Sequence, residues 1–411
     1  MSHALLNKKN LLTFISITLF YFFESAQMGY YNVLAPAFLH HGEMQHGKIA
    51  AISAAYYYGD MIGLFPVGYA LDKFPLRNTL IWALIGSIFG AFLLTVSDNF
   101  YAQWIARFIC GFSGGAFSFL GGIRVIALVE AKRFTFFMGV FLAAGMLGGM
   151  LCQYPLLIVV QNFGPKAAMV TMFFLGLFAV LFNWRYLRPS EHIINHRENI
   201  YQGTSFQLCK EIGLNLRNWC DVLMVVMLDT PVSIIGTLWG IVFLMGFFNF
   251  DAKTSSIIVM VLFAGLMAGL PIWGYLADRY HYSSWIIIVG AGFSFCSAIL
   301  LYFLQKNYCH AWMISAVFFF LGFFSSCQSL GFTWLTKNMK PELIGRNSAF
   351  NSMIFMGSNG ALKQLGAVLL GTATVLIDSK PASNLLLIIT ASMLIAAIYA
   401  SLRKSIFNVV I

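Results

Sequence analysis

The sequence is poor in charge. Only 10% of its 411 residues are charged, whereas 59% are hydrophobic, and the mean hydropathy is +0.79. A soluble domain carries roughly 25% charged residues, because its surface must face water. This chain has too little charge to cover such a surface. The composition excludes a soluble enzyme, a disordered protein and a secreted disulfide scaffold, and it indicates an integral membrane protein.

Cysteine pairs and common cofactor motifs are also lacking. The seven cysteines are scattered without a CxxC pair, and most lie in apolar runs, where cysteine acts as a small hydrophobic residue. His40, His41 and His46 form a loose group that we assign to a loop surface. The sequence contains no GxxxxGK[ST] loop, so ATP hydrolysis by this chain is unsupported. We therefore expect no metal and no cofactor.

Apolar runs fill most of the chain. A helix crosses the roughly 30 Å hydrocarbon core of a bilayer in about 20 residues. Runs of this length occur at 11–38, 49–71, 78–97, 101–129, 134–161, 165–187, 220–248, 254–277, 284–304, 310–335, 347–376 and 384–402. The first is too long for a signal-peptide core, so we expect it to be retained. Because the alternation of a membrane barrel is lacking, the prediction is an all-α protein with twelve transmembrane helices.

Basic residues are distributed unevenly between the predicted loops. With a cytoplasmic N-terminus, 17 Lys and Arg lie in loops on the cytoplasmic side, 5 lie in loops on the other side and 3 lie within spans. Cytoplasmic loops of membrane proteins carry the excess of basic residues. We therefore predict that both termini are cytoplasmic. The same distribution accounts for the net charge of +10, so we expect no nucleic acid partner.

The chain divides into two related halves. The longest polar stretch, 188–219, separates six spans in 1–187 from six spans in 220–411. Residues 59–74 read GDMIGLFPVGYALDKF and residues 265–280 read GLMAGLPIWGYLADRY, with seven of sixteen positions identical. A weaker match relates Gly149-x-Leu151-x-Gln153 to Gly360-x-Leu362-x-Gln364. We expect two pseudo-symmetric six-helix bundles joined by a cytoplasmic loop.

Both copies of the repeat end in a Gly-x-x-x-Asp-basic loop, and span four contains Arg107-x-x-x-Gly111. Together with the twelve spans and the central loop, these motifs resemble those of the major facilitator superfamily. The resemblance implies that superfamily's fold and transport by alternating access. It also implies a conformational gate, to which we assign Gly68, Asp72, Arg77, Arg107, Gly274, Asp278 and Arg279. The first loop departs from the motif at Pro75, and the second departs from it after Arg279.

Spans one and two narrow the resemblance. Residues 21–24 read YFFE and residues 56–60 read YYYGD. These segments are similar to a bacterial branch that includes phagosomal nutrient transporters and carriers of carboxylate siderophores of intracellular pathogens. The resemblance implies a bacterial inner-membrane protein, which we expect to be a monomer in contact with the lipid bilayer.

Six ionisable residues lie inside the predicted spans away from the span ends, and they are Glu24, Asp60, Asp229, Arg107, Arg124 and Lys363. Each costs roughly 2.5–3.5 kcal/mol at mid-membrane, so they should face a wet cavity or one another. Three acids and three bases sum to zero, which leaves mutual pairing as an alternative to function. Arg107 matches the superfamily motif, for which we expect a conformational or proton-handling role.

The acids are candidates for proton coupling. A carboxyl group in a low-dielectric site can exchange a proton near neutral pH. Asp60 has Leu266 as its counterpart in the repeat, so the fold does not require a carboxylate there. Glu24 lies near the middle of its span and shares a helical face with Gln27 and Tyr31. We assign proton coupling to Glu24 and Asp60 first, and to Asp229 as a third candidate.

The cations are candidates for binding an anionic solute. Lys363 has Cys152 as its counterpart, so the fold does not require this cation either. Arg124 could bind a carboxylate through two hydrogen bonds, or its side chain could reach the membrane interface. The predicted substrate-binding residues are Arg124, Lys363, Gln27, Tyr31, Tyr57, Asn359 and Gln364.

These features predict a secondary active transporter driven by protons. Its expected solute is a small organic anion such as a carboxylate siderophore. An amino-acid or nucleoside carrier and an exporter of the same solutes remain alternatives. A membrane-embedded enzyme is disfavoured because no catalytic cluster or large soluble loop is present, and a channel is disfavoured because duplicated halves suit rocking better than a fixed pore.

Overall fold

The computed structural model describes residues 8–40, 44–129, 134–188, 215–280, 284–304, 310–331, 344–370 and 379–407. Every regular element in these ranges is helical. The N-terminal half contains α1 (Lys8–Gly29), α2 (Tyr31–His40), α3 (His46–Lys73), α4 (Leu76–Val96), α5 (Phe100–Cys110), η1 (Gly111–Gly115), α6 (Ala116–Val129), α7 (Phe134–Leu151), α8 (Tyr154–Phe163) and α9 (Pro165–Tyr186). The C-terminal half contains α11 (Leu216–Pro231), η3 (Val232–Trp239), α12 (Gly240–Phe248), α13 (Ala252–Arg279), α14 (Ser284–Phe303), α15 (Ala311–Ser325), α17 (Ile344–Leu370) and α18 (Ser379–Phe407).

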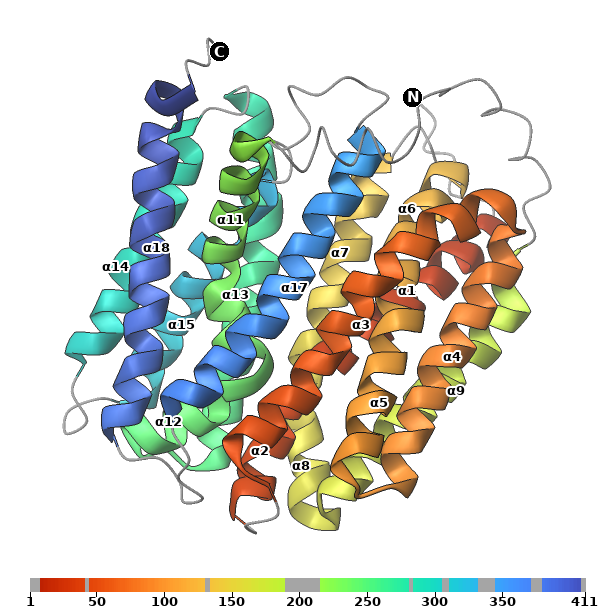
Figure 1. Ribbon diagram of the computed structural model, residues 1–411, viewed down its shortest axis with the longest axis horizontal. Coiled ribbons are helices and arrows are strands. Elements are labelled where there is room, and N and C mark those ends of the chain that lie inside the picture. Colours follow the sequence, from red (N-terminus) through yellow and green to blue (C-terminus); the bar gives the residue numbers. More distant parts are fainter. Residues whose placement is uncertain are drawn as a thin grey trace.

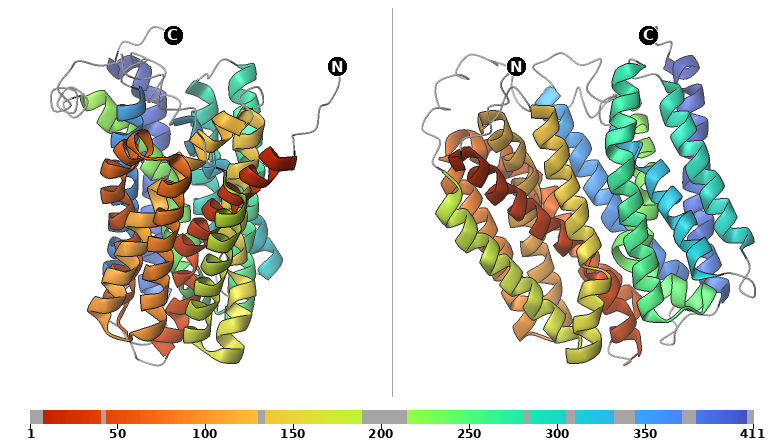
Figure 2. Two further views of the ribbon diagram at one scale, coloured as in Figure 1. Left: turned by 90° about the vertical axis from the view of Figure 1, so that its right-hand side faces the viewer. Right: turned by 180° about the vertical axis from the view of Figure 1, so that it is seen from behind.

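The two halves lie side by side as helical bundles. Helix α1 begins, and α18 ends, at the same end of the molecule, which we call the terminal end (Figure 1). Helices α2, α8 and α12 gather at the opposite, far end (Figure 1). Both halves appear as separate bundles when the molecule is seen from behind (Figure 2). Most of the predicted central stretch, 189–214, lies outside the described residues, so this domain boundary stays a prediction.

Ten helical segments of the described chain are long and apolar enough to cross a membrane. Two predicted spans, α3 and α17, do not belong to these ten, because polar residues interrupt their apolar surfaces. Helix α3 carries Asp60, and α17 carries Asn359 and Lys363. The two helices pack against each other across the two halves (Figure 1). With them the described chain has the twelve spans predicted from the sequence.

The repeat occupies equivalent packing positions in the two halves. A Cβ atom on Gly59 of α3 would collide with the backbone of Phe108 and Phe112 in the fourth span. A Cβ atom on Gly265 of α13 would collide likewise with the backbone of Phe319 and Phe323 in α15. Glycine permits this close approach of two helices. The residues that repeat in the sequence therefore make the same kind of helix contact twice.

Two spans contain π-helical stretches. In the fourth span, η1 separates α5 from α6, and in the seventh span η3 follows Pro231 at the end of α11. A π-helical turn shifts the backbone hydrogen bonds by one residue and occurs frequently at functional sites. The proline at the start of η3 gives a local cause for the change, because proline disturbs the hydrogen bonding of an α-helix. Both stretches border the buried charges described next.

Two helix starts at the far end are capped by side chains. Asn99 accepts hydrogen bonds from the backbone N–H groups of Tyr101 and Ala102 at the start of α5, at 2.8 and 3.3 Å. Asp251 accepts from the backbone N–H of Thr254 at the start of α13, at 3.3 Å. Hydrogen bonding from Thr254 lowers the pKa of the Asp251 carboxyl group. These caps satisfy backbone donors that have no partner within the helix.

Candidate functional site

Five of the six ionisable residues predicted within spans are buried. Arg107 and Lys363 are 0% exposed, and the three acids Glu24, Asp60 and Asp229 are between 1% and 6% exposed. They come from five helices, α1, α3, α5, α11 and α17. The structure therefore gathers charges from both halves in the interior, at a cost that a transport function would explain.

The two acids of the N-terminal half lie against the glycines of η1. A Cβ atom on Gly114 would collide with the carboxylate of Glu24, and one on Gly115 would collide with that of Asp60. Glu24 accepts hydrogen bonds from Ser87 Oγ at 2.6 Å and from Tyr56 Oη at 2.8 Å. One oxygen of Asp60 has no protein hydrogen-bond partner. The glycines of η1 thus make room for two carboxyl groups with different surroundings.

Arg107 lies among three tyrosine rings. Its guanidinium carbon is 5.3, 4.9 and 4.8 Å from the ring centroids of Tyr30, Tyr31 and Tyr56. Its Nη1 donates to Gln27 Oε1 at 3.2 Å, whereas its Nε and Nη2 have no protein hydrogen-bond partner. The stacked rings stabilise the cation. They leave its unused donors available to an acceptor.

The buried charges of the C-terminal half are held by uncharged side chains. Asp229 accepts hydrogen bonds from Gln328 Nε2 at 2.8 Å and from Asn359 Nδ2 at 2.9 Å. The ammonium group of Lys363 donates to the hydroxyl of Thr237 in η3. In the described part of the chain, Lys363 makes no ion pair within 4.0 Å. Its positive charge therefore lacks a bound carboxylate there.

Lys363 also lies where the two halves contact each other. Its ammonium nitrogen lies 4.7 Å from the ring centroid of Tyr57, which belongs to α3 of the N-terminal half. The ring centroids of Tyr57 and Tyr56 are 5.8 Å apart, and the guanidinium group of Arg107 stacks on the ring of Tyr56. Gln27 and Tyr31 are fully buried near the same arginine. The structure thus brings together five predicted binding residues, which are Lys363, Tyr57, Gln27, Tyr31 and Asn359.

Two predicted binding residues lie elsewhere. Arg124 donates from Nη1 to the backbone oxygen of Leu71 at 2.6 Å, near the terminal end of α3. Leu71 is fourteen residues beyond Tyr57 on the same helix, about 21 Å along its axis. Gln364 is exposed, although its neighbour Lys363 is buried, because successive residues of a helix point in different directions. The spacing of residues along the sequence did not reveal either placement.

The predicted gate residues lie at the terminal end, apart from Arg107. Arg77 donates to the backbone oxygens of Leu187 and Trp184 at 2.7 and 2.8 Å, which ties the start of α4 to the end of α9. Arg279 donates to Tyr275 Oη at 3.2 Å, one helical turn away. Gly68 and Gly274 have open space where a Cβ atom would lie. The side chains of Asp72 and Asp278 lie outside what the structure describes.

A hydrogen-bonded contact joins the two halves at the far end. Asn32 is fully buried in α2, and its Nδ2 donates to Gln153 Oε1 at 3.0 Å and to the backbone oxygens of Ile235 and Gly236 at 3.3 and 3.2 Å. Its Oδ1 accepts from the backbone N–H of Ile241 at 3.2 Å. We call this contact the Asn32 clamp. Sequence reasoning missed it, although a lone asparagine within an apolar span was a visible signal.

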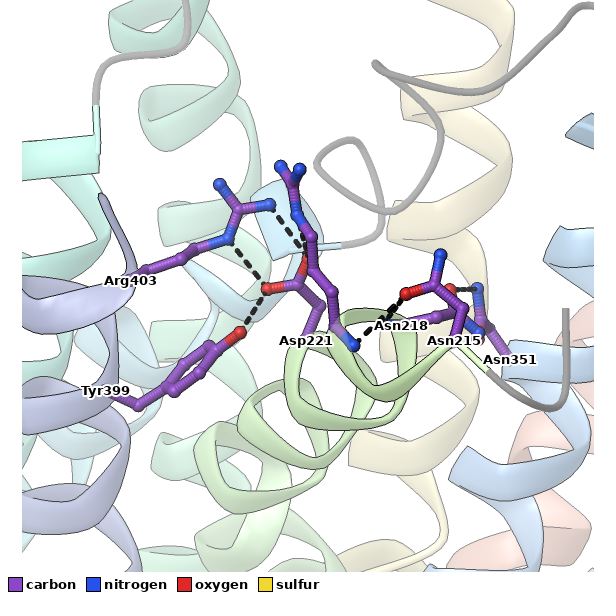
Figure 3. A network of polar contacts seen from close by, with 7 residues as sticks. Asn215, Asn218, Asp221, Asn351, Tyr399 and Arg403 are labelled. Carbon is purple, nitrogen blue, oxygen red and sulfur yellow. Dashed lines mark hydrogen bonds and ion pairs between the residues drawn. The ribbon is translucent and has the colours of Figure 1, made fainter. Parts of the chain in front are cut away.

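A second missed network holds the C-terminal half together at the terminal end (Figure 3). Asp221 of α11 accepts from Arg403 Nε at 2.7 Å, from Arg403 Nη2 at 2.8 Å and from Tyr399 Oη at 2.7 Å. Asn218 and Asn351 exchange two hydrogen bonds, at 2.9 and 3.2 Å, between α11 and α17. Figure 3 shows these residues converging from three helices. The network anchors α17, the helix that carries Lys363, to the rest of its bundle.

Comparison with known proteins identifies the architecture. A family model described as Major Facilitator Superfamily matches residues 14–362. The crystal structure of the nucleoside transporter NupG is similar, with a TM-score of 0.76, 11% identity, and coverage of 96% of this chain and 98% of the other. A bacterial homologue of the human lysosomal transporter Spinster, in an inward-facing and unoccupied conformation, has a TM-score of 0.78, 13% identity and 98% coverage of both chains. No curated protein matches the sequence.

Proposed function

The chain belongs to the major facilitator superfamily and is a transporter of small solutes, and we propose that its solute is an organic anion moved together with protons across a bacterial inner membrane. One observation carries the proposal. Lys363 is fully buried between the halves and makes no ion pair within the described residues. A buried cation without a bound carboxylate is costly, and an anionic solute would offset that cost.

The position of Lys363 suits alternating access. In this mechanism the solute binds near mid-membrane and the two halves rock around it. Lys363 belongs to α17 and contacts Tyr57 of α3, so a solute held there would touch both halves. A carboxylate-bearing solute, including a carboxylate siderophore, would accept hydrogen bonds from the ammonium group.

Proton coupling is assigned to the buried acids. Glu24 and Asp60 lie beside η1, and Asp229 lies one hydrogen bond from Asn359 on the helix of Lys363. A proton on one of these groups would change the charge of the interior and hence its preference for an anion. Glu24 and Asp60 are the leading candidates, because one carboxylate oxygen of Asp60 has no hydrogen-bond partner in the protein and is available to a proton.

The gate is assigned to the terminal end, which we propose is cytoplasmic. Arg77 already connects α4 to α9 there, and Arg124 binds the backbone of α3 beside Asp72. We therefore move Arg124 from the solute site to the gate, together with Gly68, Asp72, Gly274, Asp278 and Arg279. Breaking and remaking such contacts would let the halves close and open at this end.

The test is uptake into proteoliposomes with an imposed proton gradient. The panel contains an iron-loaded carboxylate siderophore, simple carboxylates, amino acids and nucleosides, each measured with and without a protonophore. Lys363→Gln is expected to lower anion uptake by about tenfold or more, and the exposed control Lys166→Gln should change it little. Nucleoside uptake that Lys363→Gln leaves unchanged would overturn the proposal.

A further inference from the structure

The strongest unexplained feature of the interior is a set of buried donors around Arg107. Arg107 Nε and Nη2, Gln27 Nε2 and the hydroxyls of Tyr30 and Tyr31 have no protein hydrogen-bond partner. All four side chains are 0% exposed. Buried polar groups are almost always paired, so a concentration of unpaired donors needs an explanation. A carboxylate would satisfy several of them at once, because each of its oxygens accepts more than one hydrogen bond.

The nearby acids do not serve as the counter-ion of Arg107. In the described chain no carboxylate lies within 4.0 Å of its guanidinium group. The oxygens of Glu24 are bound instead by Ser87 and Tyr56. In the other half, the oxygens of Asp229 are bound by Gln328 and Asn359 rather than by Lys363. Both buried cations therefore remain without a carboxylate, although three acids lie in the same interior.

Arg107 and Lys363 belong to different halves and are linked through the rings of Tyr56 and Tyr57. The guanidinium carbon of Arg107 is 4.8 Å from the ring centroid of Tyr56. The rings of Tyr56 and Tyr57 are 5.8 Å apart, and Tyr57 is 4.7 Å from the ammonium nitrogen of Lys363. The two tyrosines are consecutive in α3, so they fix the two cations relative to one helix. The two cations, one from each half, therefore lie against two consecutive rings of α3.

We propose that the transported anion is a dicarboxylate or larger polycarboxylate, with one carboxylate on Arg107 and its tyrosine hydroxyls and a second on Lys363. This inference rests on the proposed function and specifies its solute. Arg107 is then a binding residue of the N-terminal half rather than a gate residue. Each half contributes one cation, so a dianion holds the halves together where a monoanion would engage one of them.

The test compares three succinate derivatives that differ in charge. Purified protein is titrated with succinate, monomethyl succinate and dimethyl succinate, and binding is followed by calorimetry and by thermal stability. Succinate should bind at least about tenfold more tightly than its monoester, and the diester should not bind. Malonate, glutarate and citrate then report which spacing of the carboxylates fits best.

Two single variants locate the two anionic groups. Arg107→Gln and Lys363→Gln should each reduce succinate affinity to that of monomethyl succinate in the unchanged protein, and the double variant should abolish binding. Lys166→Gln, at an exposed site, is the matched control. Because Arg107→Gln could impair folding, Arg107→Lys and Lys363→Arg are included, which retain the charge and should retain partial preference for the dianion.

The outcomes separate this inference from the proposed function. Equal binding of succinate and its monoester, with loss only in Lys363→Gln, would overturn the dianion site and leave organic-anion transport standing. Loss of binding by none of the variants would overturn the role of both cations in binding. Stabilisation by nucleosides but by no carboxylate, from malonate to citrate, would overturn both proposals together.

Discussion

The N-terminal and C-terminal halves share a packing plan but differ in what they bury. Gly59 and Gly265 make the same close helix contact in the two halves. At the next position, however, Asp60 has Leu266 as its counterpart in the repeat, and Lys363 has no cationic counterpart in the N-terminal half. The duplicated residues are the glycines that bring helices together, whereas the buried charged residues occur in one half only. A duplicated scaffold can therefore carry a site that is not itself duplicated.

The halves also differ at the terminal end. In the N-terminal half, α1 is tied to α9 by neutral hydrogen bonds, from Asn183 to the oxygen of Ser16 at 2.9 Å and from Thr13 to the oxygen of Tyr186 at 3.1 Å. In the C-terminal half, α11 is tied to α18 by the ion pair of Asp221 and Arg403 (Figure 3). We therefore expect the stability of the C-terminal half to depend more strongly on single residues at this end.

The largest expected effect separates the acids of the two halves. Glu24→Gln should lower proton-driven accumulation of the solute by about tenfold or more, while solute exchange without a gradient is largely retained. Asp229→Asn should have a smaller effect, because an amide can keep hydrogen bonds to Gln328 and Asn359 after reorientation. Accumulation and counterflow in proteoliposomes measure both. A greater loss in Asp229→Asn would move proton coupling to the C-terminal half.

The next effect concerns the anchors at the terminal end. Arg403→Gln removes the 2.7 Å ion pair of Asp221, which is 3% exposed, leaves its longer contact with Arg217 at 3.9 Å, and should cost about 2–3 kcal/mol of stability. Asn183→Ala removes neutral hydrogen bonds and should cost about 1 kcal/mol. Thermal unfolding in one detergent compares the two variants. The double variant Asp221→Leu with Arg403→Leu is expected to recover the stability lost in Arg403→Gln. Equal losses in Arg403→Gln and Asn183→Ala would contradict the expected difference between the two halves.

Close packing of the repeat predicts a matched pair of effects. Gly59→Ala and Gly265→Ala each place a methyl group against the backbone of another helix and should destabilise by about 1–3 kcal/mol. Gly292→Ala is the control, because nothing lies within 4 Å of its added Cβ atom. Melting temperatures should fall in the first two and stay level in the control. A fall in only one half would show that the equivalence of the halves does not extend to stability.

The smallest effect compares two helix caps. Asp251→Ala and Asn99→Ala should each cost about 1 kcal/mol or less. The pKa of the Asp251 carboxyl group is lowered in the folded protein, so its contribution is present above the unfolded pKa and is lost as the pH falls through the folded value. The Asn99 cap cannot titrate. Melting curves between neutral and acidic pH should therefore show a pH-dependent difference for Asp251→Ala alone.

Composition and periodicity predicted the fold well, because the bilayer imposes a length and an apolar surface on each span. The same rule explains why α3 and α17 do not belong to the ten segments found by length and apolar composition, since a helix that lines a polar interior must carry polar residues. The site was harder to predict. Arg107 and Arg124 lie on one span and both suggested function, yet the first lies among buried tyrosines and the second lies at the end of α3.

The geometry of the fourth span explains why the two arginines are placed so differently. Position along a sequence converts to depth and direction only for a regular helix, and η1 interrupts that span between the two arginines. The motif around Arg107 suggested a gate, because sequence resemblance carries no information about which side chains lie opposite it. The clamp residue Asn32 gave a polar signal, but apart from Gln153 its partners are backbone groups, which have no signature in the sequence.

Because Asn32 binds backbone groups of η3, the side chains of η3 can be substituted without removing these hydrogen bonds. The Asn32 clamp binds the backbone of Ile235, Gly236 and Ile241, so no side chain of η3 takes part in it. The side chains of Ser233 and Thr237 in the same stretch point to Asn359 and Lys363 instead. Under the proposed function, substitutions at Ser233 and Thr237 would alter which solute is accepted and leave the Asn32 clamp in place. Evolution could thus vary selectivity and closure separately within eight residues of one helix.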